Sequence, residues 1–172
     1  LEKMPANEAA DLMDNLENDT TERLLHEMEP EASEDVRDLL EYPDDTIGSL
    51  MTTDVLTFTA DQTIENVIDY IRKEQPEMES LYSLFIVDEK NVLKGKFSMR
   101  DLLVTDPQMK LEKVMNTDLY SVNDYDKLDS LSETVSKYNL LAVPVTNDNN
   151  ELEGMVVVDD IVDELLGERR TA

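Results

Sequence analysis

The chain of 172 residues carries 41 acidic and 15 basic side chains, and its formal net charge of −26 disfavours nucleic acid as a partner. It has no cysteine and one histidine, His26, which excludes disulfides, thiolate or histidine-rich metal sites and thiol nucleophiles. Its apolar runs, such as residues 155–158, are far shorter than the roughly 20 residues that span a bilayer, so no stretch is predicted to cross a membrane.

The negative charge is densest at the N-terminal end. Residues 1–45 hold 16 acidic and 3 basic residues, a net charge of −13, and the remaining 127 residues hold the other −13. A solvated surface that keeps the protein soluble would explain this balance, and so would a surface that attracts cations. Composition alone leaves both interpretations open.

The first forty-odd residues predict three short helices. Pro5 suits a first helical turn, Asp19 or Thr20 can cap a second helix, and Pro30 opens a third. Apolar pairs at 12–13, 24–25 and 39–40 recur at the spacing expected of short helices stacked on one another. We therefore expect a small all-helical domain over residues 1–43, truncated at its start.

The rest of the chain repeats itself. A Met-x-Thr-Asp sequence at residues 51–54 returns at residues 115–118, at an offset of 64. Farther along, the matching residues are 59 apart; they are Gly95 with Gly154, Asp101 with Asp160, and Leu102 with Ile161. The change of offset puts about five extra residues in the first copy, and Pro76 indicates that they form a loop.

Each copy predicts the order strand, helix, strand, strand, helix. The two predicted hairpins join residues 84–87 to 94–97 and residues 142–145 to 155–158 through polar turns. Two such β-α-β-β-α units, over residues 44–105 and 106–168, have too little core to fold alone and should pack as one unit. The expected fold class is α+β, an all-helical N-terminal domain followed by a tandem pair of repeats.

The second strand of the first hairpin leads into a recognisable motif. Residues 95–102 read Gly-Lys-Phe-Ser-Met-Arg-Asp-Leu, and this motif, together with the repeat and the Leu-Met-Thr at 50–52, resembles CBS domains. Residues 42–52, 85–95 and 98–107 are similar to the cytosolic region of MgtE magnesium transporters, and the acidic helical segment precedes them as it does there. The two repeats would then be a tandem CBS-domain pair.

The resemblance implies a regulatory region and no enzyme. In that family the CBS pair forms a homodimer, and a connecting plug helix leads into a transmembrane pore of the same full-length chain, at the cytoplasmic face of a prokaryotic membrane. Residues 158–168 would form the end of the pair and the start of the plug helix. The sequence has no Gly-rich phosphate loop and no nucleophile placed beside His26, so it does not indicate a catalytic site.

Under this resemblance Mg²⁺ is the expected ligand. Mg²⁺ keeps several waters and needs only one or two carboxylates, so its sites leave no dedicated sequence motif. Asp159, Asp160 and Asp163 place three carboxylates within five residues at a predicted helix start. Their mutual repulsion favours a bound cation, whereas the helix dipole alone would explain one or two of them. The resemblance assigns the carboxylate that bridges the domains to Asp160.

Further candidate metal ligands follow from the same resemblance. Glu164 and Glu168 continue the acidic run into the predicted plug helix. The partner carboxylate should come from the helical domain, where Glu8 and Asp11 lie on adjacent turns of the first helix. The sequence does not choose between these two.

Asp129 falls where the family has another acidic residue. Lys127 and Asn139 occupy the neighbouring acidic positions, which favours a plain surface role for Asp129 over metal binding. The implied mechanism is electrostatic: at low Mg²⁺ the two acidic domains repel each other, and at high Mg²⁺ bridging ions stabilise the compact arrangement that closes the pore.

An adenine nucleotide such as ATP is the alternative ligand, because many CBS pairs hold one in the cleft between repeats. The resemblance places Ser98 and Asp101 on the ribose, and the charge of Arg100 suits a contact with phosphate. The position where some relatives place an aromatic side chain against the base falls at Ser83, and Tyr82 lies next to it. In the second copy Val157 takes the hydroxyl position, which leaves one intact site of two. The competing interpretation is that Ser98 and Asp101 simply cap the helix after the hairpin.

Overall fold

The N-terminal domain contributes two described helices to the structure, a computed structural model that describes residues 6–14, 18–28, 39–131 and 142–157. They are α1 (Ala6–Asp14) and α2 (Asn18–Glu27), and the Thr21 hydroxyl of α2 donates a hydrogen bond to the Met13 carbonyl of α1 at 3.1 Å. Both helices were predicted, but α2 begins at Asn18, so Asp19 and Thr20, the predicted capping residues, lie inside it. The predicted third helix lies mostly outside the described residues.

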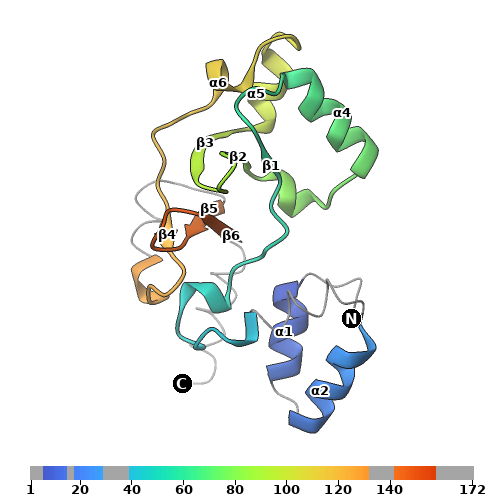
Figure 1. Ribbon diagram of the computed structural model, residues 1–172, viewed down its shortest axis with the longest axis vertical. Helices are drawn as coiled ribbons and strands as arrows, with labels where there is room; N and C mark the ends of the chain where they lie inside the picture. The colour runs from blue at the N-terminus through green and yellow to red at the C-terminus, as the bar shows by residue number, and fades with distance from the viewer. Residues whose placement is uncertain (1–5, 15–17, 29–38, 132–141, 158–172) are drawn as a thin grey trace.

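The first repeat, repeat 1, has the predicted order strand, helix, strand, strand, helix. Its elements are β1 (Thr57–Phe58), α4 (Ile64–Glu74), β2 (Leu84–Val87), β3 (Leu93–Phe97) and α5 (Met99–Val104), with short 3-10 helices at Ile47–Ser49 (η1) and Met78–Leu81 (η2). β1 pairs in parallel with β2, and β2 pairs antiparallel with β3 (Figure 1).

Repeat 2 builds a second sheet of the same order. It begins with α6 (Leu111–Val114), and its sheet contains β4 (Val122–Asn123), β5 (Ala142–Thr146) and β6 (Leu152–Val157), with β4 parallel and β6 antiparallel to β5. The helices predicted after β4 and after β6 fall largely outside the described residues. The last strand begins at Leu152, earlier than the predicted residue 155, because a tight turn precedes it.

The two hairpin turns are built alike. Asp88 Oδ1 accepts hydrogen bonds from the backbone amides of residues 90 and 92, and Asn147 Oδ1 accepts them from those of residues 149 and 151. The fourth residue of each turn, Asn91 or Asn150, adopts a left-handed conformation (φ 65° and 62°), which asparagine tolerates better than most residues. A side chain thus closes each turn within four residues.

The segment that leads into each repeat pairs with the last strand of the other repeat. Thr52 and Met155 pair through two backbone hydrogen bonds (2.8 and 2.9 Å), and Asn116 and Lys96 pair in the same way (2.7 and 3.1 Å). The methionine before each leading residue lies over the glycine of the other repeat: Met51 over Gly154, and Met115 over Gly95. The repeated Met and Gly positions in the sequence therefore mark a contact between the repeats.

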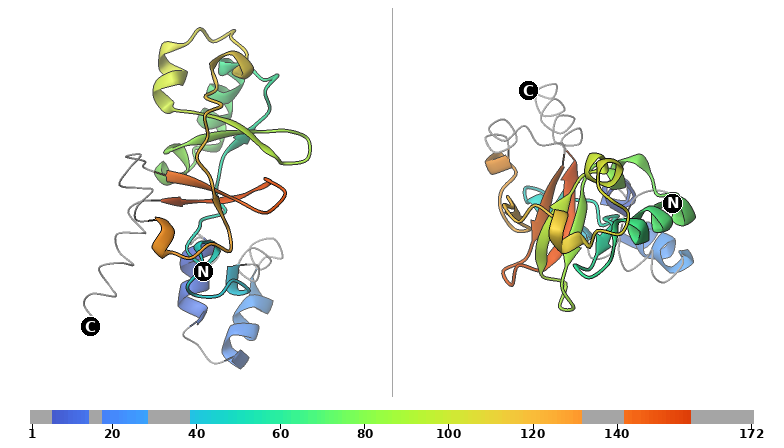
Figure 2. Two further views of the ribbon diagram at one scale, coloured as in Figure 1. Left: turned by 90° about the vertical axis from the view of Figure 1, so that its left-hand side faces the viewer. Right: turned by 90° about the horizontal axis from the view of Figure 1, so that it is seen from above.

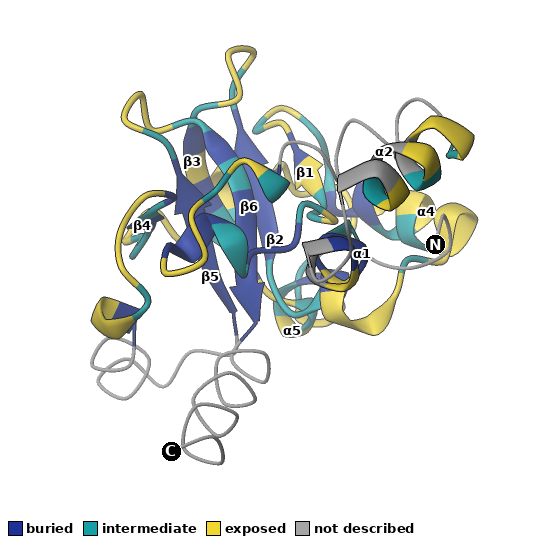
Figure 3. Cartoon of the chain, turned by 90° about the horizontal axis from the view of Figure 1, so that it is seen from below, coloured by how far each residue is buried: buried dark blue, intermediate teal, exposed yellow. Residues whose placement is uncertain are grey.

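The core has three parts. One lies inside repeat 1, around Phe58, Ile64 and Leu84, and a second joins the repeats, with Phe85 from β2 close to Met155 from β6. The buried residues concentrate on the strands, whereas α2 and α4 expose their outer faces (Figure 3). The left view of Figure 2 shows the two sheets against each other in the middle of the molecule and the helical domain at the end where repeat 2 lies.

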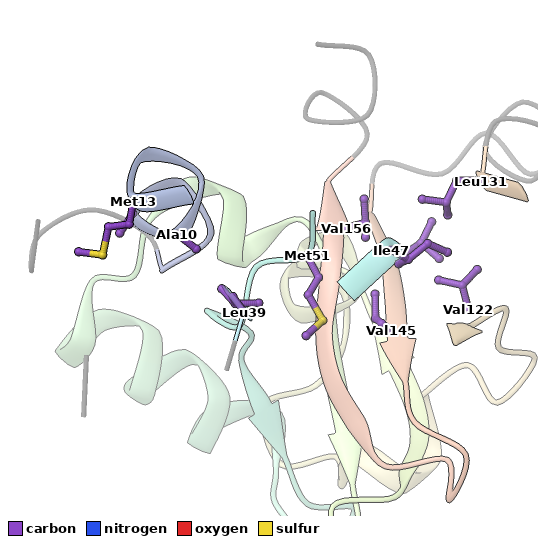
Figure 4. Close-up of a cluster of buried hydrophobic side chains, with 11 residues drawn as sticks. Ala10, Met13, Leu39, Ile47, Met51, Val122, Leu131, Val145 and Val156 are labelled. Carbon is purple, nitrogen blue, oxygen red and sulfur yellow. The ribbon is translucent and has the colours of Figure 1, made fainter. Parts of the chain in front are cut away.

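The third part of the core links the helical domain to repeat 2. Ala9, Ala10 and Met13 of α1 belong to one buried cluster with Leu39, Ile47, Met51 and residues of β4, β5 and β6. In Figure 4, Leu39 lies between α1 and Met51. Among the residues that the structure describes, no helix is long and apolar enough to span a bilayer.

Candidate functional site

The predicted metal ligands lie mainly at the C-terminal end of the chain. Asp159, Asp160, Asp163, Glu164 and Glu168 all fall outside the described residues. Within the described ranges, no group of three or more acidic or histidine side chains is placed to hold a metal ion. The assignment of Mg²⁺ to the C-terminal acids therefore stays a prediction.

The metal candidates of the first helix are both carried by α1. Glu8 is exposed, next to the buried Ala9 and Ala10 that face the shared cluster, and Asp11 follows less than one turn later. An acidic residue thus borders the apolar contact between the helical domain and repeat 2. This position suits a carboxylate that acts at the domain boundary.

Asp129 is exposed on the surface of repeat 2, shortly after β4. Its neighbour Lys127 forms an ion pair with Asp45, which precedes η1. The positive charge of Lys127 is therefore paired with a carboxylate of the same chain. This favours the surface interpretation of Asp129.

The nucleotide candidates Ser98, Arg100 and Asp101 share the first turn of α5. Ser98 Oγ accepts a hydrogen bond from the Asp101 amide (3.2 Å), and Asp101 Oδ2 accepts one from the Ser98 amide (2.9 Å). This reciprocal capping box is the helix-capping role that the sequence allowed. Among the described residues no hydrogen bond uses Asp101 Oδ1, which leaves that oxygen for a ribose hydroxyl, and Arg100 is exposed.

Tyr82 lies at the same end of the hairpin as this turn. The antiparallel register pairs Leu84 with Phe97, so Tyr82, two residues before β2, and Ser98, directly after β3, are brought to one edge. Tyr82 is half-buried and packs against the core between the repeats. Val157 is buried in β6, so the second copy offers no hydroxyl at the equivalent place.

Two residues near this edge were not identified from the sequence. Among the residues that the structure describes, the Thr53 hydroxyl is buried without a hydrogen-bond partner, and partial burial raises the pKa of the neighbouring Asp54 carboxyl. The Ser80 hydroxyl donates to the Asp54 carbonyl (2.9 Å), which ties this segment to the one that carries Tyr82. An unpaired hydroxyl suits a site that hydrogen-bonds a polar ligand. Among the described residues, this edge therefore offers hydrogen-bonding groups to a ligand but no cluster of metal-ligating side chains.

Comparison with known proteins assigns the chain to a class and then to a family. The CBS domain model matches residues 47–106 and 111–167, so repeat 1 and repeat 2 form a tandem CBS pair. The model of the MgtE intracellular N domain matches residues 1–45. The chain therefore belongs to the MgtE family.

The curated relatives agree. The magnesium transporter MgtE of Enterococcus faecalis is 37% identical over 134 residues, which cover 77% of this chain and 29% of the relative. That of Thermus thermophilus is 32% identical over 147 residues, 86% of this chain and 33% of the relative. The chain thus spans about a third of the length of these relatives. Because they are transporters, they confirm the prediction that this region is not an enzyme.

Solved structures match the whole arrangement. The crystal structure of the soluble part of a magnesium transporter superimposes with a TM-score of 0.92 at 32% identity, over 97% of this chain and 65% of that one. The cytosolic domain of the Mg²⁺ channel MgtE in complex with ATP gives a TM-score of 0.90 at 29% identity, over 94% of this chain and 66% of that one. The predicted fold class, a helical domain followed by a CBS pair, is confirmed.

Proposed function

We propose that this chain is the Mg²⁺-sensing regulatory region of a magnesium transporter or channel, at the cytoplasmic face of the membrane. Mg²⁺ bridges acidic surfaces of the helical domain and the CBS pair, and the closed arrangement gates the pore. The pore belongs to the part of the full-length relatives that this chain does not match, and two copies associate through their CBS pairs.

The observation that carries this proposal is the shared core of two like-charged domains. α1 and repeat 2 contribute to one hydrophobic cluster, although residues 1–45 and the rest of the chain each carry a net charge of −13 (Figure 4). Apolar contact stabilises closure and charge repulsion opposes it. A cation that is held between the domains removes the repulsion and leaves the attraction.

Several weak sites are enough for such a switch. A change in the ratio of open to closed molecules from 99:1 to 1:99 requires about 5.5 kcal/mol of differential binding. A few Mg²⁺ ions, each held more tightly by the closed form, supply this jointly. Weak individual sites also let the region respond to free Mg²⁺ at about millimolar levels.

Calorimetric titration of the chain with Mg²⁺ tests the proposal at its site. We expect saturable binding that Asp160→Ala weakens about tenfold, because removing one of the few carboxylates costs an inner ligand. Asp118→Ala is the matched control, since it removes the same charge from an exposed position of the CBS pair. Equal loss in both variants would mean that only net charge matters and would contradict a specific site.

ATP binding is the second candidate function, favoured by the edge that holds Ser98, Asp101 and the unpaired Thr53 hydroxyl. A similar domain has been solved in complex with ATP. In this chain Asp101 Oδ1 would accept from the ribose, Arg100 would contact phosphate and Tyr82 would border the base. ATP and Mg²⁺ binding are compatible because they use different residues.

Comparing ATP with adenosine tests this assignment. Arg100→Ala should weaken ATP binding about tenfold and leave adenosine binding unchanged, because a charge-assisted contact to phosphate is lost. Arg72→Ala, at an exposed arginine of α4, is the control. If Arg100→Ala changes neither affinity, Arg100 does not face the phosphates.

A further inference from the structure

The backbone that joins the two repeats is built twice, with twofold symmetry. In one copy the amides of Ile47 and Gly48 donate to the carbonyls of residues 126 and 124, and the Leu128 amide donates to the Asp45 carbonyl (2.9, 2.7 and 3.0 Å). In the other copy the amides of residues 111 and 112 donate to the carbonyls of residues 62 and 60, and the amide of residue 64 to that of residue 109 (2.8, 3.1 and 3.0 Å). Every residue of one set is 64 positions from its counterpart.

The first of these copies carries two polar contacts that the second lacks, whereas the second has a side-chain hydrogen bond from Gln108 to Glu65 (2.9 Å). The Tyr42 hydroxyl donates a hydrogen bond to Asp124 Oδ2 (2.8 Å), and Lys127 forms its ion pair with Asp45. The counterparts in the other copy cannot make either contact. Asp106 and Ala60 stand in place of Tyr42 and Asp124, and Met109 and Thr63 stand in place of Asp45 and Lys127. The fold of a repeat therefore does not require these contacts.

Tyr42 is held tightly in this position. Its ring lies against Gly48 so closely that a Cβ there would be 2.4 Å from a ring carbon, and its ring centroid is 5.2 Å from that of Tyr125. Burial, followed by the hydrogen bond to Asp124, raises the pKa of Tyr42 above its ordinary range, so the phenol stays a donor at physiological pH. Asp124 is 5% exposed and depends on that donor.

The additional contacts lie at the junction with the helical domain. Leu39, Leu40 and Tyr42 belong to the same cluster as α1, so the segment that leaves the helical domain reaches repeat 2 before repeat 1 begins. Asp124 in turn donates its amide to the carbonyl of Thr146 in β5 (3.0 Å), and β5 pairs with β6. A continuous set of contacts thus runs from α1 to the last described strand without passing through repeat 1.

We propose that Tyr42, Asp45, Gly48, Asp124 and Lys127 form a junction clasp, a coupling element that holds residues 42–48, where the helical domain leads into repeat 1, on repeat 2 without a metal ion. Lys127 supplies within the chain the positive charge that this acidic junction needs. The clasp itself is assembled with or without Mg²⁺, so its existence does not depend on the proposed function. Only the use of this coupling rests on the proposed function.

Hydrogen exchange followed by mass spectrometry tests the clasp on the whole chain in EDTA and in saturating Mg²⁺. We expect peptides from 42–51 and 122–128 to be equally protected in both buffers. Tyr42→Phe should speed their exchange about tenfold, because a buried carboxylate loses its partner, and Lys127→Glu about threefold. Tyr70→Phe and Lys73→Glu, at an exposed tyrosine and an exposed lysine of α4, should change neither peptide.

Peptides from 84–97 in repeat 1 serve as the internal reference. Unchanged exchange there shows that a variant is folded and that the effect is confined to the junction, as the clasp requires. Protection of 42–51 that is lost in EDTA, or variants that speed exchange equally in both repeats, would overturn the clasp. Absence of Mg²⁺ binding would contradict the proposed Mg²⁺ sensing. It would leave the clasp intact, because exchange in EDTA does not measure Mg²⁺ binding.

Discussion

Repeat 1 and repeat 2 share one backbone plan and differ in the polar side chains placed on it. Repeat 1 caps α5 with Ser98 and Asp101 and exposes Arg100 beside them, whereas repeat 2 has the buried Val157 at the hydroxyl position. Repeat 2 instead holds the junction with the helical domain through Asp124 and Lys127. The comparison teaches that one twofold backbone can carry different polar side chains in its two copies, and we propose ligand contact for one repeat and domain coupling for the other.

The largest effect is expected at the two equivalent glycines. A Cβ at Gly154 would be 2.5 Å from the backbone oxygen of Thr52, whereas one at Gly95 would first meet the flexible side chain of Met115, at 2.7 Å. Gly154→Ala should lower the free energy of unfolding by about 3 kcal/mol and Gly95→Ala by about 1 kcal/mol. Urea unfolding measures both. Equal losses would show that the two contacts are equally rigid.

The next effect concerns association through repeat 1. Leu103 and Val104 of α5 are 80% and 64% exposed, an apolar surface that a dimer would cover. Leu103→Glu should raise the dimer dissociation constant about thirtyfold, about 2 kcal/mol, because a charge replaces an apolar contact. Light scattering after size exclusion reports the mass, with Leu12→Glu, at an exposed leucine of α1, as control. If Leu12→Glu dissociates the dimer and Leu103→Glu does not, the interface lies elsewhere.

A smaller effect separates capping from ligand contact within repeat 1. Thr63 and Ser98 each form a capping box, at the start of α4 and of α5. Replacing either by alanine should cost about 1 kcal/mol of stability. Only Ser98→Ala should also weaken ATP binding, as measured by calorimetry. If Thr63→Ala weakens ATP binding equally, the loss comes from general destabilisation.

The smallest effect is a difference in acid sensitivity between the two hairpins. The backbone amide of Val92, then that of Lys90 and the charge of Lys94, hold the pKa of Asp88 below its ordinary value, whereas the equivalent Asn147 does not titrate. A lowered folded-state pKa adds stability above the unfolded value of about 3.9, and this stability is lost as pH falls through the folded value.

Urea unfolding at pH values from neutral down to below the folded pKa of Asp88 tests this difference. Asp88→Asn should remove part of the acid sensitivity, because asparagine keeps the turn acceptor without a proton to bind. Asn147→Asp should add sensitivity to repeat 2. Unfolding curves that depend on pH identically in the wild type and both variants would rule out a contribution from these turns.

Much of this organisation could be predicted from local sequence. The repeat, the order of elements and the capping residues Ser98 and Asp101 all depend on residues close to each other along the chain. The positions of Met51 and Gly154 could also be recognised in the sequence, since both recur in the other copy. The sequence did not show that each methionine covers the glycine of the opposite repeat.

The junction clasp could not be predicted. Tyr42 and Asp124 are 82 residues apart, as are Asp45 and Lys127, and neither pair belongs to a motif. Lys127 drew notice only as a departure from an acidic pattern, and its partner became visible once the fold brought the two segments together. Long-range polar pairs follow from the three-dimensional arrangement, whereas caps and turns follow from the local chain.

The most direct test of Mg²⁺-driven closure is the radius of gyration of the wild-type chain during an Mg²⁺ titration, measured by small-angle X-ray scattering beside NaCl of equal ionic strength. The compact monomer should approach roughly 16 Å, and a dimer a larger value. A saturable contraction in Mg²⁺ that NaCl does not reproduce, and that Asp160→Ala weakens, is the predicted result. A size that ignores Mg²⁺, or that NaCl reduces equally, would contradict sensing and leave the acids as a solvated surface.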